Sequence, residues 1–259
     1  MRTLCAAVLL AALGNAVAAD LTRDEVRALL ERSTAEKPAD LSGKDLSNLD
    51  LSGLDFKKAN LAKANLFGTK LVSVNLSGAN LSGANLDAAW LMRANFAKAN
   101  LTNASLFGPV IYPSLDINLA ERPDFRGVNF AGARIIARFN QLNLSGANFA
   151  GAHMGVDLKN QPMGQMRNDF SSADLAGADF SGADVNRALF AFANLSGANF
   201  KGANLFRANL SGADLTGADL TGADLTETNL DGTILKNAKG LDQVKGWDQA
   251  VNRDKALMN

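Results

Sequence analysis

A five-residue period is the feature that most constrains the fold of this chain. From Asn204 to Leu235 the sequence reads NLFRANLSGADLTGADLTGADLTETNLDGTIL, with leucine at every fifth position. An α-helix repeats its face about every 3.6 residues and a strand about every 2.0, so neither can present this pattern as one continuous element. The pattern therefore predicts a short unit stacked many times. Its predicted core ladder is Leu205, Leu210, Leu215, Leu220 and Leu225.

A single unit, such as residues 213–217, combines a short strand with a turn. Ala213 and Leu215 flank the polar Asp214, which gives the in-out-in alternation of three strand residues. Thr216 and Gly217 then turn the chain, and glycine suits a corner that needs a positive φ. One unit buries too little apolar surface to fold alone, so we expect neighbours to stack into a continuous core.

Near copies of A(D/N)LSG, such as Ala79-Asn80-Leu81-Ser82-Gly83, cover most of residues 39–238. In this motif the chain resembles the pentapeptide-repeat family. The resemblance implies an all-β solenoid, a right-handed quadrilateral β-helix with about four pentapeptides in each coil. Successive coils would then be about 4.8 Å apart, the ordinary distance between strands.

Phenylalanine replaces leucine at several central positions of the repeat. In a four-sided coil, Phe170 and Phe190 would stack on one side, and Phe180 and Phe200 on the opposite side.

Two irregular stretches, residues 107–124 and 155–169, interrupt the repeat. The first contains Pro109 and Pro113, and the second contains Pro162. Proline and glycine at such places mark loops or insertions. Because loops on a rigid support often carry function, both stretches are candidate binding surfaces.

Each end of the repeat is expected to carry a short capping helix. Residues 20–38 leave the five-residue period, and Thr22 followed by Glu25 is a capping box. Residues 239–259 show approximate helical spacing of apolar side chains, at Leu241, Val244, Trp247 and Val251. Such caps would cover the apolar core and the unpaired strand groups at the ends of a β-helix.

Residues 1–19 have the pattern of a secretory signal peptide. A positive start precedes an apolar run, and small residues follow it. The run is too short to span a bilayer, so we expect cleavage after Ala18 or Ala19 and no transmembrane segment in the mature chain. The predicted location is periplasmic or secreted. Cys5, the single cysteine, lies within the signal, so the mature chain would have no disulfide.

The residues that carry enzyme chemistry are absent or isolated in this sequence. His153 is the single histidine, and without partners it can build neither a metal site nor a nucleophile relay. Aspartates such as Asp174 and Asp214 lie between two inward residues, so they should face solvent and lack the burial that pKa tuning needs. A core filled with leucine, phenylalanine and alanine leaves no interior pocket. We expect no enzyme activity, no cofactor and no metal.

Charge is balanced over the chain but uneven along it. The formal net charge is zero, so no strong field would attract nucleic acid, and we expect no nucleic-acid partner. Residues 39–108 carry seven basic and five acidic side chains, a balance of +2, whereas residues 168–238 carry four and nine, a balance of −5. This asymmetry can orient binding or end-to-end packing, such as a homodimer through a rod end.

Two columns of side chains are candidate partner surfaces. Trp90 takes an outward position usually held by Asp or Asn, and Lys70 precedes it by one coil, within reach of a cation–π contact. Trp90 is either packed locally or an anchor for a partner. Arg187 and Arg207 would stack about 5 Å apart, and either an anion or acidic partner neutralises them or their guanidinium groups splay into water.

Two classes of function remain. The first is a non-catalytic exported structural or interaction protein that presents rigid β-helix faces and loops to an unknown protein partner in the bacterial envelope. The second follows from the resemblance, because some family members resemble B-DNA in shape and charge and bind DNA gyrase. This chain departs from them in carrying an export signal and in lacking a strong negative charge.

Overall fold

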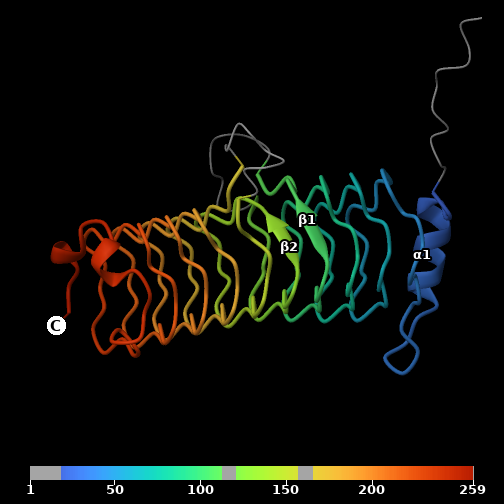
Figure 1. The fold of residues 1–259 in the computed structure, drawn as a ribbon. Coiled ribbons are helices and arrows are strands. Elements are labelled where there is room, and N and C mark those ends of the chain that lie inside the picture. The colour runs from blue at the N-terminus through green and yellow to red at the C-terminus, as the bar shows by residue number, and fades with distance from the viewer. Residues whose placement is uncertain (1–18, 113–120, 157–165, 259) are drawn as a thin grey trace, which may run out of the picture.

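The computed structural model describes residues 19–112, 121–156 and 166–258 of the protein. They form a right-handed, four-sided β-helix, seen as an elongated rod in Figure 1. The signal-peptide prediction, including Ala18, falls almost entirely outside the described residues, and Ala19 is the first residue inside them. No helix in the described part is long and apolar enough to cross a membrane.

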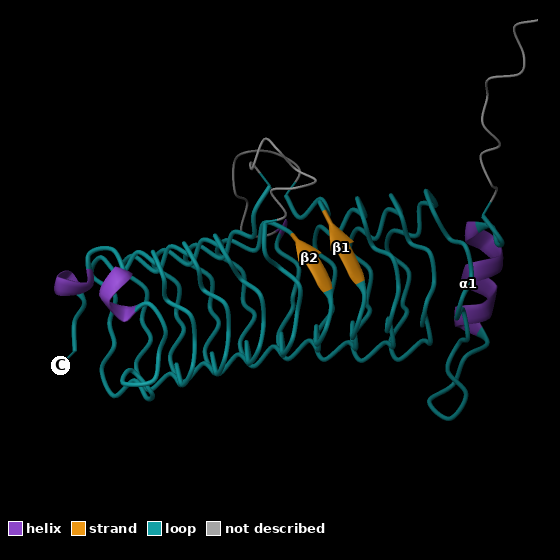
Figure 2. Ribbon diagram, in the orientation of Figure 1, coloured by secondary structure: helices purple, strands orange, loops and turns teal. Residues whose placement is uncertain are grey.

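Regular elements are few because each side of a coil is very short. The helix α1 spans Arg23–Glu31, the strands β1 and β2 span Ser105–Phe107 and Arg134–Ile136, and the 3-10 helices η2 and η3 span Trp247–Gln249 and Arg253–Lys255. Strands β1 and β2 pair in parallel (Figure 2). Elsewhere, single residues form parallel bridges to the next coil, as Asn60 does with Asn80.

The bridges define four faces, which we name after their outward residues in the first coil. These are the Asp40, Asp45, Asp50 and Asp55 faces. The Asp50 face, for example, continues through Lys70, Trp90 and Val110. The register skips both irregular stretches: on the Asp40 face it passes from Asn100 to Asn129, and later Arg138 pairs with Asp169. The bridges thus continue across each stretch, and the repeat resumes after it. We call residues 39–108 the first block and residues 169–239 the second block.

The interior is filled as the period predicts. All five side chains of the core ladder, from Leu205 to Leu225, are at most 1% exposed. Phe170 stacks on Phe190 with ring centroids 5.0 Å apart, and Phe180 stacks on Phe200 at 4.9 Å. The two stacks meet edge to face, at 89° between Phe180 and Phe190. Such pairs add roughly 0.5–1.5 kcal/mol each beyond the burial of their area.

The outward Asp or Asn of each unit holds the corner that follows it. Its Oδ1 accepts the backbone N–H two residues later, as Asn80 does from Ser82 at 3.2 Å and Asp214 from Thr216 at 2.8 Å. This local bond fixes the turn, which is why Asp and Asn recur there. The corner residue then takes a positive φ, 69° at Gly217. The outward column, expected to be only a solvated face, therefore has a structural role.

Asparagines of successive coils are also joined by side-chain ladders with a fixed direction. The Nδ2 of Asn80 donates to Oδ1 of Asn60, and that of Asn100 donates to Asn80, at 3.1 and 3.2 Å. Because the donors point toward the N-terminus, an aspartate can accept in such a ladder but cannot donate to the coil before it, as at Asp179, which accepts from Asn199. The first coil has no coil before it, and its outward residues are all aspartate, namely Asp40, Asp45, Asp50 and Asp55.

The N-terminal helix forms with the capping box that the sequence predicts. Glu25 N–H donates to Thr22 Oγ1 at 3.3 Å, and Thr22 N–H donates to Glu25 Oε2 at 2.7 Å. Hydrogen bonds from the Thr22 backbone N–H and hydroxyl to the Glu25 carboxylate lower the pKa of that carboxyl below its ordinary value. Val26 anchors α1 on the first coil and is fully buried.

The C-terminal segment is not the continuous helix that its spacing predicts. Residues 239–258 instead wind one further coil, with two 3-10 helices at its corners. The bridging residues of this coil are six apart, at Lys239, Lys245, Val251 and Leu257. Gly246 and Asn252 have positive φ, which interrupts any α-helix. Trp247 does pack against the core, as predicted. The six-residue units thus place apolar side chains at intervals that resemble those on one face of an α-helix.

Candidate functional site

Three large aromatic side chains are exposed close together in the first block. Phe67 is 46% exposed, Trp90 41% and Phe107 40%. Phe67 and Phe107 occupy the same corner two coils apart, between the Asp45 and Asp50 faces, and Trp90 lies on the adjoining Asp50 face of the coil between them. We call these three residues the aromatic surface. The sequence pattern pointed only to Trp90 of this group.

Lys70 lies beside Trp90 on the neighbouring coil, as the register predicts. Its Nζ is 6.0 Å from the indole centroid and 3.8 Å from Oδ2 of Asp50. Arg23 approaches the same carboxylate, at 3.6 Å. Asp50 therefore shares its charge between two cations, and its pKa is lowered, mainly by hydrogen bonds from Ser52 and further by Lys70 and Arg23. This network fixes one edge of the aromatic surface.

The ends of the two irregular stretches lie next to this surface. Met166, which is 41% exposed, lies near the end of the second stretch, and its methyl group lies beside Gly108 of the first. Together with Pro109, Ile136, Arg138 and neighbouring residues they line a cavity of about 290 Å³. The described residues thus bring the flanks of both stretches to one side of the rod.

The first stretch is fastened at both of its ends to the next coil. The Tyr112 hydroxyl donates to the Asn140 carbonyl at 2.6 Å, and Arg122 donates to Gln141 Oε1 at 2.8 Å. Burial raises the pKa of the Tyr112 hydroxyl. Within the described part of the chain, two buried polar atoms here have no hydrogen-bond partner, Nε of Arg122 and Oδ1 of Asn140.

The arginine column of the second block is partly neutralised within the protein. Arg207 Nε donates to Glu227 Oε2 at 2.6 Å, and this bond lowers the pKa of the Glu227 carboxyl. The Arg207 guanidinium also lies 4.9 Å from the Phe206 ring. Arg187 adds a weaker attraction to Glu227. Glu227 therefore supplies one negative charge against the two positive charges of Arg187 and Arg207.

Phe67 and Phe107 were missed because the sequence pattern was followed along the outward columns. Corner positions carry many residue types, so an aromatic residue there breaks no rule of the repeat. A search for large apolar residues directly after each central leucine would have found both. For the same reason the repeat pattern did not indicate Phe192, a corner residue of the second block that is 71% exposed.

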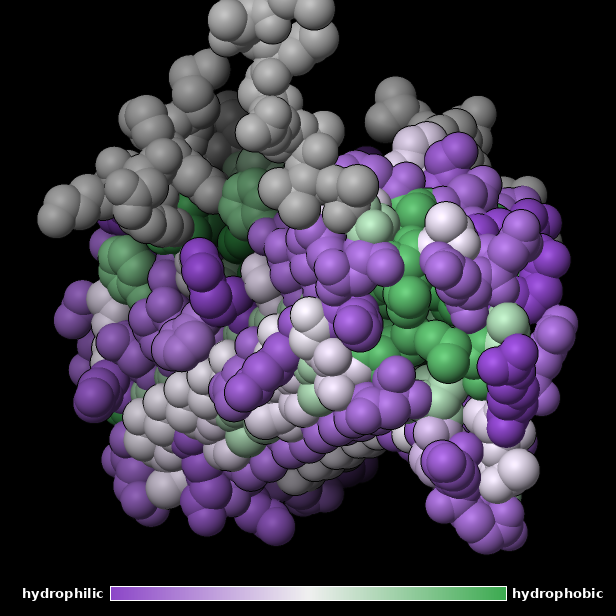
Figure 3. Space-filling model, turned by 90° about the vertical axis from the view of Figure 1, so that its right-hand side faces the viewer, coloured by the Kyte–Doolittle hydropathy of each residue, from purple (hydrophilic) through white to green (hydrophobic). Residues whose placement is uncertain are grey.

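The described residues contain no group of three or more His, Cys, Asp or Glu side chains that could hold a metal ion. His153 lies on the Asp45 face between Arg134 and Asp184. A groove of about 620 Å³ lies at the N-terminal end of the rod, between α1 and the first coil. Figure 3 looks at this end and shows an apolar strip framed by polar side chains.

Comparisons with known proteins agree with this geometry. The family model described as pentapeptide repeats matches residues 39–71, 69–108, 169–205 and 203–239. Among solved structures, HetL, a pentapeptide repeat protein involved in heterocyst differentiation regulation from the cyanobacterium Nostoc sp. strain PCC 7120, is 27% identical with a TM-score of 0.55. That match covers 92% of this chain and 94% of HetL.

A trypsin-treated form of QnrB1, a plasmid-mediated fluoroquinolone resistance protein, is 19% identical with a TM-score of 0.50. The match covers 76% of this chain and 89% of QnrB1. At this identity the likeness shows the fold alone. A search of curated protein sequences found no match.

Proposed function

This chain belongs to the pentapeptide-repeat family, and we propose that it is an exported, non-catalytic interaction protein that binds a partner through its aromatic surface. The main support for this proposal is a cluster of three aromatic side chains, each 40–46% exposed, on one corner and its adjoining face: Phe67, Trp90 and Phe107. Tryptophan is enriched among the residues that dominate binding energy, and contiguous apolar patches mark interaction sites.

The backbone beneath this surface favours tight binding. Trp90 is bridged to Lys70 on one side and to Val110 on the other, and Ala88 N–H donates to the Phe107 carbonyl at 2.9 Å. Little backbone freedom is left to lose on association, so the cost of ordering is already met in the free protein. Three rings presented in this way suit an apolar protein surface better than a small polar ligand.

Export is the second component of the proposal. It is supported by the positive start, apolar run and small residues of residues 1–19, together with a chain whose single cysteine lies in that segment. The partner would then be a protein of the bacterial envelope. Binding of DNA gyrase, the alternative that the resemblance suggested, has only the rod-shaped fold in its support.

The test compares two substitutions of exposed aromatic residues. Trp90→Asn places the usual repeat residue on the Asp50 face, so the fold should be kept, whereas recovery of an envelope partner by the tagged protein should fall at least about tenfold. Phe192→Ser removes a more exposed ring from the second block and should leave recovery unchanged. Equal recovery by both variants and the wild type would refute the role of the aromatic surface.

Localisation is tested separately by fractionation and mass spectrometry of the N-terminus. A periplasmic or secreted product that begins at Ala19 or Asp20 is expected. A cytoplasmic product that retains Met1 would contradict export, and inhibition of gyrase supercoiling at stoichiometric amounts would then support the alternative function.

A further inference from the structure

The first coil has an exposed edge, and the N-terminal segment covers only part of it. On the Asp45 face, Asp20 replaces a missing coil: its N–H donates to the Asp45 carbonyl, and its Oδ2 accepts the Asp45 N–H, both at 2.8 Å. On the Asp50 face, the Arg23 guanidinium donates to the carbonyls of Asp50 and Ser52. Residues 20–23 therefore pair with two faces of the edge.

The Asp55 face of the same edge is open. Within the described residues, the N–H of Asp55 and the carbonyls of Asp55 and Lys57 have no hydrogen-bond partner. The equivalent groups one coil later are all used. Asn75 N–H donates to the Leu54 carbonyl at 3.1 Å, and the carbonyls of Asn75 and Ser77 accept from the N–H groups of Phe56 and Lys58 at 2.7 and 3.1 Å.

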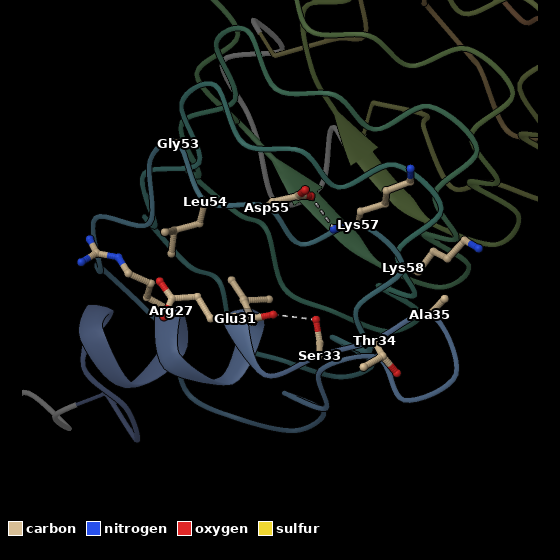
Figure 4. A pocket seen from close by; sticks show the side chains of 11 residues that line it. Arg27, Glu31, Ser33, Thr34, Ala35, Gly53, Leu54, Asp55, Lys57 and Lys58 are labelled. Carbon is tan, nitrogen blue, oxygen red and sulfur yellow. Dashed lines mark hydrogen bonds between the residues drawn. The ribbon is translucent and has the colours of Figure 1, made fainter.

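The groove of about 620 Å³ lies against this open edge. It is lined by residues of the first coil and of the α1 segment, namely Gly53, Leu54, Asp55, Lys57 and Lys58, and Arg27, Leu30, Glu31, Ser33, Thr34 and Ala35. In Figure 4, Leu54 extends from the coil toward α1, and Arg27 and Glu31 extend from the helix. The groove thus combines unpaired strand groups with an apolar floor.

Leu54 explains the apolar floor. It occupies the inward position that is alanine in most later units, such as Ala79 and Ala99. At the end of the stack no preceding coil fills the space, so a large side chain fits there, and Leu54 is 9% exposed. Leu30 of α1 packs against the same end of the core.

We propose that this groove binds an extended peptide segment of a partner protein, which adds a strand to the Asp55 face. The peptide would accept a hydrogen bond from Asp55 N–H and donate to the carbonyls of Asp55 and Lys57, as a preceding coil would. One apolar side chain of the peptide packs on Leu54 and Leu30. Main-chain pairing supplies affinity, and this apolar contact selects the register.

The charge of the rim specifies acidic flanking residues. Lys57 and Lys58 are exposed and have no ion pair among the described residues, whereas Arg27 is already paired with Asp24 at 3.3 Å. The Asp55 Oδ1 accepts from Lys57 N–H and Asn75 Nδ2, and the carboxylates of Asp55 and Glu31 also belong to the lining. The lining holds three basic side chains, Arg27, Lys57 and Lys58, against the two acidic ones, a balance of +1 that favours Asp or Glu beside the apolar residue of the peptide.

This site is separate from the aromatic surface. It uses the open edge at the end of the rod, and it would remain if Trp90 had no partner. Failure of the peptide test below therefore leaves the proposed function standing, and failure of the Trp90 test leaves the edge proposal standing.

The probe is a fluorescent library of acetylated, amidated pentapeptides with Asp or Glu at both ends and an aliphatic residue at the second and fourth positions. Binding to the purified protein is measured by fluorescence polarisation. We expect binders whose affinity falls at least about tenfold when the amides that donate to Asp55 and Lys57 are N-methylated. No binder in the library, or binders indifferent to N-methylation, would overturn the proposal.

Matched variants locate the binding. Lys58→Glu should weaken binding of the selected peptides at least about tenfold. Lys98→Glu is the control, because Lys98 holds the same corner as Lys58 two coils further along and, like it, has a positive φ. It should change affinity less than about twofold. Equal effects of the two charge reversals would show a general electrostatic attraction and refute the edge site.

Discussion

The two repeat blocks are alike inside and different outside. Leu76 of the first block and Leu215 of the second lie on the same face, and both are fully buried. Outside, the second block keeps mostly Asp and Asn on its columns, whereas the Asp50 face of the first block runs through Lys70 and Trp90. The core tolerates little change, so differences accumulate where the side chains face solvent. The proposed binding function uses this exterior of the first block.

Phe192 marks the limit of this comparison. It is the most exposed large apolar side chain of those described, yet it belongs to the second block. Its ring lies against Gly212 of the next coil, where an added Cβ would be 2.6 Å from two ring atoms. Among the described residues of the second block, no second exposed aromatic side chain accompanies it, in contrast to the three rings of the first block.

The largest expected effect on stability comes from substitutions in the interior, which is alike in the two blocks. Leu76→Asp and Leu215→Asp should each lower the free energy of unfolding by more than about 3 kcal/mol, because each places a carboxyl in an apolar stack. Urea denaturation of both variants measures this. A mild effect at one position and a large one at the other would show that the two interiors are not equivalent.

A smaller difference is expected from the side-chain ladders. Asn80→Asp removes the donor to Asn60 and should cost about 1 kcal/mol. Asp179→Asn should change stability by less than half of that, because Asp179 begins a ladder and Asn199 donates to it. The same denaturation experiment compares the two, and equal losses would contradict a ladder of fixed direction.

Acid should loosen the first coil before the second block. Hydrogen bonds from Ser42, Ser47 and Ser52 hold the pKa values of Asp40, Asp45 and Asp50 below their ordinary value.

A carboxyl with a lowered folded pKa stabilises the protein above its unfolded pKa, about 3.9, and this contribution is lost as pH falls through the folded pKa. The pKa of Asp219 in the second block is lowered as well, but Asp219 lies inside the stack. Hydrogen exchange between about pH 5 and about pH 2.5 should therefore show the first coil opening first. Earlier opening around Asp219 would contradict this.

The smallest effects on stability are expected at the exposed rings. Trp90→Asn and Phe192→Ser should each shift the free energy of unfolding by no more than about 0.5 kcal/mol, since neither side chain fills the core. Thermal melting of both variants checks this. A loss of several kcal/mol for Trp90→Asn would mean that Trp90 is a structural residue, and its use as a binding anchor would lose its basis.

The interior could be predicted from the sequence because one rule governs it. The five-residue period places Leu215 and its neighbours in the core, and the stacking of Phe170 on Phe190 follows from the number of sides. The Thr22 capping box was also readable, since it depends on residues three apart.

The features that were missed depend on neighbours that are distant in sequence. The direction of the ladders requires knowing which coil donates to which, and the role of Arg23 requires knowing which strand groups the first coil leaves open. At the C-terminus, a change from five to six residues per unit imitated helical spacing. The exposure of Phe67 and Phe107 follows from their corner positions, which the repeat leaves free to vary.

Site-specific photo-crosslinking tests the central claim most directly. A benzoylphenylalanine residue would replace Trp90 in the first block or Leu189 in the second, two outward positions on the same Asp50 face. In cells that produce the protein, the account predicts one defined crosslinked envelope protein from position 90, reproduced with that purified partner, and none from position 189. Crosslinking from position 189 alone, or equally from both, would contradict the assignment of function to the first block.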